Sequence, residues 1–244
     1  MRIAALASLI FSLGSLSALA AGTITVYPQN AQPLKVTGAQ RLADLVTQPA
    51  LTQSWWPGAV ISERQASAVA SQQHQALLAR LAALAAKEDA DDAAAINSVR
   101  QQLSALKVTG RQFINLDPDS VRVRPRNDVP LEGDYSLWVG PQPATVTLMG
   151  LVSSPGPKPF TPGKPVADYL DEVNRLSGGD RSYAWVVYPD GRTQKVPVAY
   201  WNKRHVEPMP GSIIFLGFAE HTFTSSYDDL NEQILRSLTQ RIPD

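Results

Sequence analysis

The sequence predicts an α+β protein made of two tandem β-grasp (ubiquitin-like) domains, and three features of the chain support this prediction. Residues 145–218 read as two strands, a short helix, a hairpin and a final strand, which is the element order of that fold. Parts of this pattern recur earlier in the chain, and a helical hairpin interrupts the earlier copy. An amphipathic segment follows the second copy.

The recurrence is visible as two offsets between matching phrases. Residues 36–37 and 42–46 match residues 160–161 and 166–170 at an offset of 124, and residues 130–137 match 208–215 at an offset of 78. The offsets differ by 46, so the first copy carries about 46 residues that the second lacks. We therefore expect a signal peptide at 1–20, a first domain at 21–140 with a helical-hairpin insertion at about 62–107, a second domain at 141–220 and a C-terminal amphipathic helix at 221–244.

Residues 1–20 have the features of a secretory signal peptide. Arg2 supplies a positive charge, residues 3–13 are mostly apolar, and residues 18–20 form a small-x-small cleavage site. The alternative, a membrane anchor, needs about 20 uninterrupted apolar residues, and serines and a glycine interrupt this run. We therefore expect an exported protein.

Composition and charge exclude several classes of protein. The 22 basic and 22 acidic residues give a formal net charge of +0, and no Lys/Arg stripe carries interleaved aromatic residues, so we expect no nucleic-acid partner. The chain has no cysteine, which excludes both a disulfide framework and a lipid-bearing cysteine. Packing alone has to hold the fold together.

The first domain follows from alternation and turn signals. Residues 23–27 alternate at period two and predict a strand. We expect the remaining elements as follows: a turn at 28–32, a strand at 33–37, a helix at 40–46, a turn and strand at 55–61, a resumed chain at 108–116, a turn at 117–119, a short strand at 121–124, a closing strand at 133–139 and a linker at 141–143.

The insertion reads as an α-helical hairpin. Residues 62–65 resemble a capping box with Ser62 as the N-cap. A charged turn at residues 87–92 separates the two helices, and His74 on the first helix is expected to be solvated. Apolar residues fall on one face of each predicted helix: Ala66, Ala70, Leu77, Leu81 and Leu84, then Ile96, Val99, Leu103 and Leu106.

The second domain repeats this plan without the insertion. Residues 145–152 predict its first strand, and Pro and Gly residues at 153–158 predict a turn region. The expected elements after that are a helix at 166–173, strands at 183–188 and 192–198 joined by a turn at 189–191, and a strand after the turn at 208–212.

The C-terminal segment predicts an amphipathic helix over residues 227–241. In one interpretation its apolar face packs on the protein itself. In the other it docks on a partner protein or makes a peripheral membrane contact, and the absence of a Lys/Arg flank and of large aromatics favours protein over lipid. The residues of that face are Tyr227, Leu230, Ile234, Leu238 and Ile242.

Few residues indicate chemistry. His74, His205 and His221 have no metal-ligand spacing, and the chain has no P-loop, Rossmann glycine pattern or nucleophile elbow. We therefore assign no catalytic residue, no metal and no cofactor. Asp117 and Asp119 form a carboxylate pair, but the intervening proline favours a turn.

Two features are candidates for ligand binding. Trp55 and Trp56 either present an aromatic platform to sugar rings or pack the inserted hairpin onto the core. Arg111 follows Gly110 where the insertion rejoins the domain, and the junction of two packed units is a natural cleft. A guanidinium there either holds a carboxylate or sugar hydroxyls, or forms a structural ion pair. With Asp117, these residues form the candidate ligand-binding set.

Several phrases resemble one protein family. The chain is similar to the GfcC-like capsule biosynthesis proteins over essentially the whole expected mature chain. The phrases that carry this resemblance, in the order of the family, lie at residues 129–135, 160–170, 189–191, 201–205, 208–211, 230–231 and 238–241.

The resemblance implies a periplasmic protein of group 4 (O-antigen type) capsule operons, with two β-grasp domains, a helical insertion in the first and a C-terminal amphipathic helix. It implies similarity to the SLBB domains of Wza-type outer-membrane polysaccharide exporters and a role in capsule or exopolysaccharide export. The expected partners are such an exporter, the capsular polysaccharide, or both. Because the chain has no lipid-bearing cysteine, we expect an accessory protein and not the pore itself, and we expect a monomer.

Three functional hypotheses remain. The leading one is a non-enzymatic accessory of polysaccharide export that binds the machinery or the polymer. The second is a polysaccharide-modifying enzyme that uses Arg111 with Asp117 or Asp119. The third is a glycan-binding module built around Trp55 and Trp56.

Overall fold

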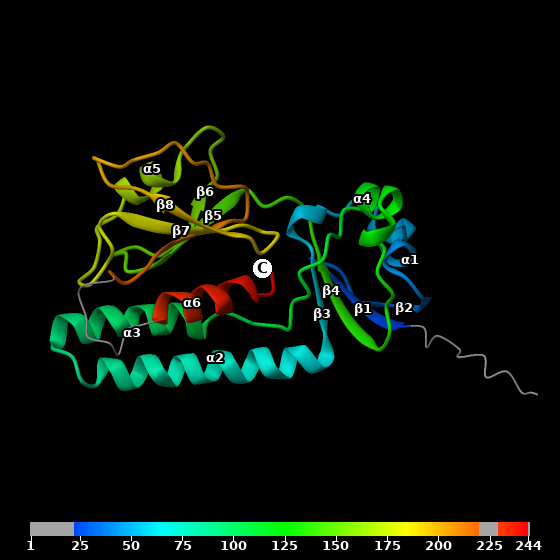
Figure 1. Ribbon diagram of the computed structural model, residues 1–244, viewed down its shortest axis with the longest axis horizontal. Coiled ribbons are helices and arrows are strands. Elements are labelled where there is room, and N and C mark those ends of the chain that lie inside the picture. Colours follow the sequence, from blue (N-terminus) through cyan, green and yellow to red (C-terminus); the bar gives the residue numbers. More distant parts are fainter. Residues whose placement is uncertain (1–21, 220–228, 244) are drawn as a thin grey trace, which may run out of the picture.

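The computed structural model describes residues 22–219 and 229–243, so the expected signal peptide and Tyr227 lie outside the described residues. The described chain is an α+β protein of two lobes (Figure 1). Its helices and strands are β1 (Gly22–Pro28), β2 (Leu34–Ala39), α1 (Leu42–Val46), β3 (Val60–Glu63), α2 (Arg64–Ala85), α3 (Ala90–Ser104), α4 (Pro118–Val123), β4 (Asp134–Val139), β5 (Thr145–Gly150), β6 (Gly156–Pro159), α5 (Val166–Asp171), β7 (Tyr183–Val187), β8 (Thr193–Pro197), β9 (Ile213–Leu216) and α6 (Leu230–Thr239). Three single-turn 3₁₀ helices are η1 (Pro49–Leu51), η2 (Trp56–Gly58) and η3 (Pro125–Asn127).

The two sheets repeat one pattern of strands. In the first lobe the order is β2-β1-β4-β3, with β1 parallel to β4 and the other pairs antiparallel. In the second lobe the order is β6-β5-β9-β7-β8, with β5 parallel to β9 and the other pairs antiparallel. A short helix, α1 or α5, follows the opening hairpin in each lobe. The prediction of a mixed α+β protein with two related sheets is confirmed, whereas the β-grasp identity of the lobes stays a prediction.

The first lobe has its own hydrophobic core. Strand residues such as Ile24, Ile61 and Leu137 are buried against α1 and against Val121 of α4. These elements all come from the first 140 residues, and no residue of α2 or α3 belongs to this described cluster.

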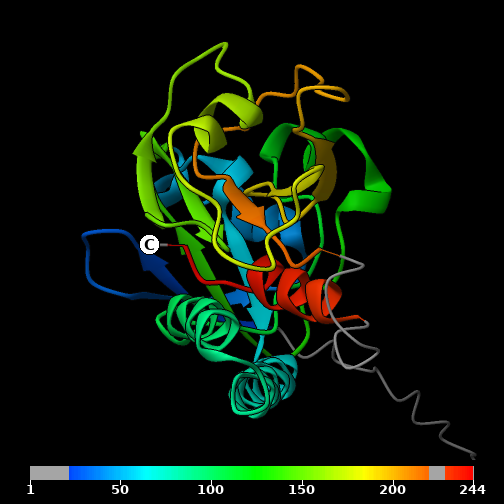
Figure 2. The ribbon, with the colours of Figure 1, turned by 90° about the vertical axis from the view of Figure 1, so that its left-hand side faces the viewer.

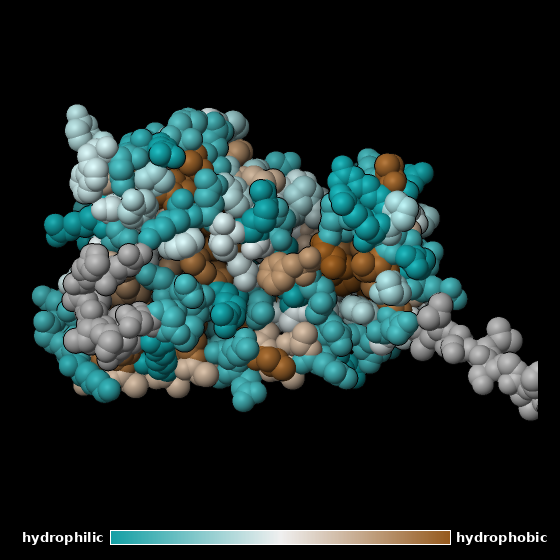
Figure 3. Space-filling view, in the orientation of Figure 1, coloured by the Kyte–Doolittle hydropathy of each residue, from teal (hydrophilic) through white to brown (hydrophobic). Residues whose placement is uncertain are grey.

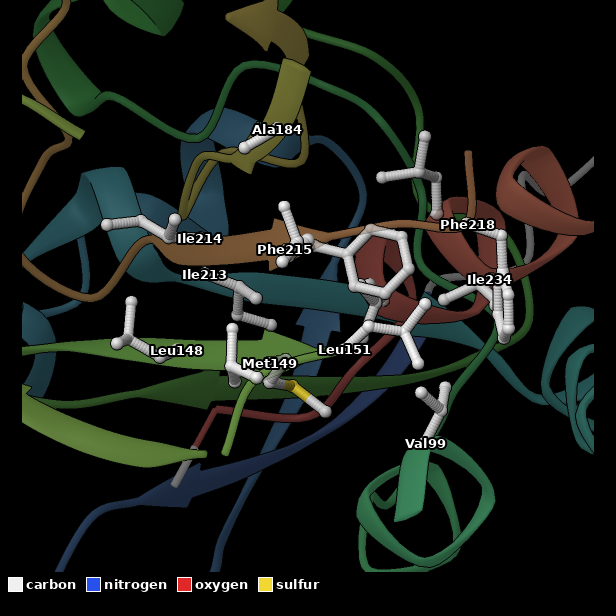
Figure 4. Close-up of a cluster of buried hydrophobic side chains, with 14 of the residues drawn as sticks. Val99, Leu148, Met149, Leu151, Ala184, Ile213, Ile214, Phe215, Phe218 and Ile234 are labelled. Atoms are coloured by element: carbon white, nitrogen blue, oxygen red, sulfur yellow. The ribbon is translucent and has the colours of Figure 1, made fainter. Parts of the chain in front are cut away.

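The core of the second lobe, by contrast, includes elements from three parts of the chain. Figure 1 shows the α2–α3 hairpin leaving the first lobe after β3 and lying beneath the second lobe, with α6 (red) between the hairpin and β7. The view turned by 90° shows α2, α3 and α6 side by side (Figure 2). Val99 of α3 and Ile234 of α6 point toward Met149, Leu151 and Phe215 (Figure 4), and these residues belong to one buried cluster.

A side chain of the hairpin also extends the hydrogen bonding of the second sheet. The Gln102 amide donates to the Gly150 carbonyl at 2.9 Å and accepts from the Gly150 N–H at 2.7 Å. It satisfies both backbone groups at the end of β5, so the hairpin is attached to the second lobe by polar contacts as well as by apolar packing.

Three predictions of local structure are wrong. Residues 121–124 do not form a strand: Asp117 accepts a hydrogen bond from the Asp119 N–H and caps α4, and Pro118 takes the first helical position, an arrangement that favours a helix start. The expected turn at residues 153–158 contains the start of β6. Ser62 does not cap α2, because it lies buried in β3 and Glu63 takes the N-cap position without a side-chain cap.

His74 is also buried, contrary to the expectation that it is solvated. Its side chain is 5 % exposed and its Nδ1 lies 2.6 Å from the Ser237 hydroxyl of α6. Burial lowers the pKa of His74, and a hydrogen bond to the Leu103 backbone opposes this effect. The ring therefore joins α2 to both α3 and α6.

Candidate functional site

Two adjoining cavities lie where the lobes meet, and Trp55 and Arg111 line both of them. We call the first the linker cavity, with a volume of about 510 Å³, and the second the tryptophan cavity, with a volume of about 770 Å³. Figure 3 shows hydrophobic residues gathered in the middle of this face, between the lobes. The linker cavity is lined by Tyr27, Trp138, Pro141, Pro143, Gly211 and Arg241 among others, and the tryptophan cavity by Trp55, Trp56, Arg111, Phe113, Asp117, Asp190 and Arg192 among others.

The position of Arg111 is set by the glycine before it. A Cβ on Gly110 would lie 2.1 Å from the backbone carbon of Ala66, so only glycine lets this segment pass the first turn of α2. The segment then runs beside β3, where the Gln112 N–H donates to the Ile61 carbonyl at 2.8 Å. Arg111 is thereby held at the junction between the hairpin and the first lobe, as expected from the sequence.

The Arg111 side chain reaches from the first lobe to the second. Its guanidinium donates to the Pro189 carbonyl at 2.7 Å and, over a longer 3.5 Å, to the Thr239 carbonyl of α6. The guanidinium carbon also lies 5.7 Å from the centre of the Phe113 ring. A guanidinium has five N–H donors, so these two carbonyls leave donor capacity for a ligand. The described partners are carbonyls and an aromatic ring, which differs from the structural ion pair that the sequence left open.

The electrostatic surroundings of Arg111 are unusual for an arginine. Burial lowers its pKa to about 10, repulsion from Arg241 adds to this effect, and attraction to Asp190 opposes it. Arg111 still carries its charge at neutral pH, but with less solvation than a surface arginine. A negatively charged or strongly polar group of a ligand would relieve this deficit.

The two tryptophans also line the tryptophan cavity. Trp56 begins η2 and packs partly against the core of the first lobe. The backbone N–H of Trp55 donates to the Gly140 carbonyl at 2.8 Å. A Cβ on Gly58 would lie 2.5 Å from the Trp55 ring. The ring therefore lies against the Gly58 backbone. Trp56 packs on a core cluster that contains no described residue of α2 or α3, so the packing that the sequence favoured for it is onto the first lobe itself.

The two carboxylates of the cavity already have structural partners. Asp117 caps α4, and Asp119 next to it does not line the cavity. Asp190 accepts from the Arg192 N–H at 2.9 Å and from its Nε at 2.5 Å, and this pairing raises the pKa of Arg192. Both carboxylates therefore already accept hydrogen bonds within the protein.

The sequence analysis missed several residues of the site. Phe113, 60 % exposed, and the Asp190–Arg192 turn line the tryptophan cavity. Tyr27 and Trp138 line the linker cavity, with ring centres 5.3 Å apart and planes 13° apart. The turn at residues 189–191 was visible in the sequence, but nothing local showed that it faces Arg111.

Comparison with known proteins identifies the family. Residues 20–142 match the family "Capsule biosynthesis GfcC, N-terminal" and residues 154–243 match "Capsule biosynthesis GfcC C-terminal". The chain belongs to the GfcC capsule biosynthesis family. It is also 63 % identical, over 237 residues and 97 % of each chain, to the "Uncharacterized protein YjbG" of Escherichia coli strain K12. Membership confirms the resemblance seen in the sequence and suggests a role of this GfcC-family protein in capsule assembly.

In this GfcC-family chain the apolar face of the C-terminal helix is part of the protein's own core. Leu230, Ile234 and Leu238 are fully buried. Ile242 lies beyond the end of α6, and its N–H donates to the Lys107 carbonyl at 2.8 Å. Leu230, Ile234 and Leu238 therefore pack on the protein itself and do not present a free surface, whereas Ile242 is half-buried.

The described parts of this GfcC-family chain offer no metal centre or membrane span. Within residues 22–219 and 229–243, no three His, Cys, Asp or Glu side chains are grouped so that they could hold a metal ion. Among the same residues, no helix combines the length and apolar character needed to cross a bilayer.

Proposed function

We propose that this protein is a non-enzymatic, periplasmic accessory of capsule polysaccharide assembly or export, and that it binds the polymer in the tryptophan cavity. The observation that carries the proposal is the convergence of Trp55, Trp56, Arg111 and Asp117 on one cavity. Trp55 and Arg111, which are 56 positions apart in the sequence, thus meet at the junction of the two lobes. The exposed Phe113 lines the same cavity.

The side chains of the cavity suit a saccharide. Flat aromatic rings match the apolar CH faces of pyranoses, and the guanidinium of Arg111 donates hydrogen bonds to hydroxyls or to a sugar carboxylate. Sites that bind small polar molecules combine apolar walls with a few placed polar groups. The family assignment to capsule biosynthesis supports a capsular polysaccharide as the ligand.

The proposal also includes the fold identity and the protein partner. The shared strand order, with the first and last strands of each sheet parallel and adjacent, supports two β-grasp domains of the SLBB type. Such domains would resemble those of Wza-type outer-membrane exporters, and an exporter of this type is the proposed protein partner. A cleavable signal peptide would deliver the protein to the periplasm.

A polysaccharide-modifying enzyme is less well supported. Hydrolysis of a glycosidic bond generally requires an acid and a base or nucleophile flanking the bond. Asp117 and Asp190 are instead committed to a helix cap and to Arg192. Purified capsular polymer should therefore keep its length distribution after incubation with the protein.

The test is binding of purified cognate polysaccharide to the mature protein, measured by calorimetry and by indole fluorescence. Loss of a charge-assisted hydrogen bond is worth about 1.5–3 kcal/mol, so we expect Arg111→Ala to weaken binding at least about tenfold. Arg111→Lys keeps the charge and loses the planar fork, so its affinity should lie between those of wild type and Arg111→Ala.

Arg122→Ala provides the matched control, because Arg122 is exposed on α4 and does not line the cavity. Circular dichroism checks that each variant is folded, since Arg111 also joins the lobes. Equal binding by wild type and a folded Arg111→Ala variant would exclude the tryptophan cavity as the site. Absence of binding by the wild type would point to a protein partner instead.

A further inference from the structure

The turn at residues 199–202 presents two adjacent aromatic side chains to solvent. Tyr200 is 100 % exposed and Trp201 is 73 % exposed, while Val198 and Ala199 just before them are buried. Scattered single apolar residues are normal on protein surfaces. Two large aromatic residues that are consecutive on one turn and both exposed are less usual.

The turn is held in place by Asn202. Its side-chain carbonyl accepts from the Ala199 N–H at 2.9 Å, and its amide donates to the Ser182 carbonyl at 3.2 Å. The Asn202 N–H closes the turn onto the Ala199 carbonyl at 3.1 Å. The two aromatic residues are therefore displayed from a braced turn, which reduces the entropy lost when a ligand stacks on them.

Most charges beside the turn are paired. Lys203 donates to Asp168 at 2.7 Å and to Asp171 at 3.4 Å, and His205 lies 2.8 Å from Glu207, whereas Arg204 between them is exposed. Attachment to an anionic membrane relies on a surplus of basic residues next to the aromatic groups, and a single exposed arginine is a small surplus. Exposed aromatic faces with few unpaired charges beside them are better suited to the CH faces of sugar rings.

The turn is also connected to the tryptophan cavity through one strand. Asp190 and Arg192 line the cavity at one end of the β7–β8 hairpin, β8 follows, and Tyr200 and Trp201 come just after its other end. The five residues of β8 alone span roughly 16 Å at ~3.3 Å each, and two further residues, Val198 and Ala199, separate its end from Tyr200. A chain of several sugars can span that distance, whereas a single sugar ring cannot.

We propose that Tyr200 and Trp201 form a second contact for the same polysaccharide, by stacking on pyranose rings of a chain that also occupies the tryptophan cavity. This inference rests on the proposed function. It implies bivalent binding, in which the second contact adds avidity only for polymers long enough to reach both places.

The test compares short and long saccharide. The mature protein is titrated with an oligosaccharide of one repeating unit and with the intact polymer. We expect Trp201→Ala to leave oligosaccharide affinity unchanged and to weaken polymer affinity at least about tenfold, which is a modest fraction of the gain that bivalency provides. Trp201→Phe, which keeps an aromatic ring, should retain most of the polymer affinity. Val123→Ala is the control, because Val123 is 78 % exposed and does not line either cavity.

The outcomes separate this inference from the proposed function. If Trp201→Ala binds the polymer as tightly as wild type, while Arg111→Ala still loses oligosaccharide binding, the second contact is overturned and the tryptophan cavity remains the binding site. Wild type that binds neither ligand overturns both. Wild type is also sedimented with phosphatidylethanolamine–phosphatidylglycerol vesicles. If it co-sediments and Trp201→Ala does not, while polymer binding is unchanged, the turn binds lipid and the inference is overturned.

Discussion

The two lobes share one pattern of strands, but their sheets are covered in different ways. The first sheet is covered by α1 and α4, which come from the same lobe. The second sheet is covered by α5 and, in addition, by α3 of the inserted hairpin and by the C-terminal α6. The insertion therefore belongs to the first lobe in sequence and to the second lobe in packing.

This difference explains where the candidate site lies. A hairpin that starts in the first lobe and packs beneath the second fixes the two lobes relative to each other. Arg111 follows the hairpin directly and donates to Pro189 in the second lobe and Thr239 in α6. Arg111, which lines both cavities, is therefore placed at the junction by the return of the hairpin to the first lobe.

The largest expected effect comes from breaking the apolar cover of the second sheet. Ile234→Ala removes a fully buried side chain from the cluster that contains Val99 and Phe215. Truncating a buried isoleucine costs about 2–5 kcal/mol. We expect the free energy of unfolding to fall by that amount, measured by urea denaturation followed by circular dichroism. Glu232→Ala, at an exposed position of the same helix, is the control and should change little.

A midpoint for Ile234→Ala equal to that of wild type would mean that α6 is dispensable for the second lobe. Ile24→Ala is the corresponding truncation in the first lobe, and its urea denaturation is compared with that of Ile234→Ala. Ile24 is fully buried in the core of the first lobe. If the hairpin makes the lobes one cooperative unit, both variants should show a single shifted transition.

The next effect concerns the point where the hairpin returns to the first lobe. Gly110→Ala places a Cβ 2.1 Å from the Ala66 backbone, and neither backbone segment can move without disturbing β3. Overpacking of this kind costs about 1–3 kcal/mol. We expect a lower midpoint in urea and weaker saccharide binding, since Arg111 shifts with its neighbour. Gly163→Ala has no neighbour within 4 Å of the new Cβ, but its φ of +78° strains an alanine. It should therefore lower the midpoint in urea as well, yet leave saccharide binding unchanged, which separates the loss of stability from the shift of Arg111.

The sequence predicted the strands and most helices of both lobes, because alternation and helical stripes report which face of a segment is buried. It did not predict what the hairpin packs against, since the stripes of Val99 and Leu103 are the same whichever sheet receives them. The strand predicted at residues 121–124 failed because two valines alternate there, while Asp117 and Pro118 carried the stronger signal of a helix start.

The candidate site was predictable to a similar degree. Arg111 was expected in a cleft because it follows the insertion, and it does line both cavities. Its partners come from carbonyls 78 and 128 residues further along the chain. A single sequence carries no local trace of such distant backbone contacts, so Phe113 and Asp190 went unnoticed.

A smaller effect tests the polar attachment of the hairpin. Gln102→Ala leaves the Gly150 N–H and carbonyl without their side-chain partner. Each hydrogen bond contributes about 0.5–1.5 kcal/mol, so we expect a loss of roughly 1–3 kcal/mol in the urea experiment. Gln101→Ala, at the exposed neighbouring position, is the matched control. Equal stability of the two variants would show that apolar packing alone attaches the hairpin.

The smallest effect is a dependence on pH that comes from His74. Burial lowers the pKa of His74 below its usual value of 6.5 in the folded protein. The unfolded chain therefore binds more protons as the pH falls through 6.5, and the free energy of unfolding decreases from that pH downward.

His74→Gln removes this titration, so its stability should fall less between pH 7 and pH 5 than that of wild type, whatever the change at pH 7. Urea denaturation at several pH values gives the two slopes. Gln75→Ala, at the exposed neighbouring position of α2, is the control because it removes no titratable group. It should keep the wild-type slope. Parallel slopes for wild type and His74→Gln would show that the ring joining α2 to α6 is protonated as readily in the folded protein as in the unfolded chain. The contact with Ser237 would then hold the three helices together without any sensitivity to acid.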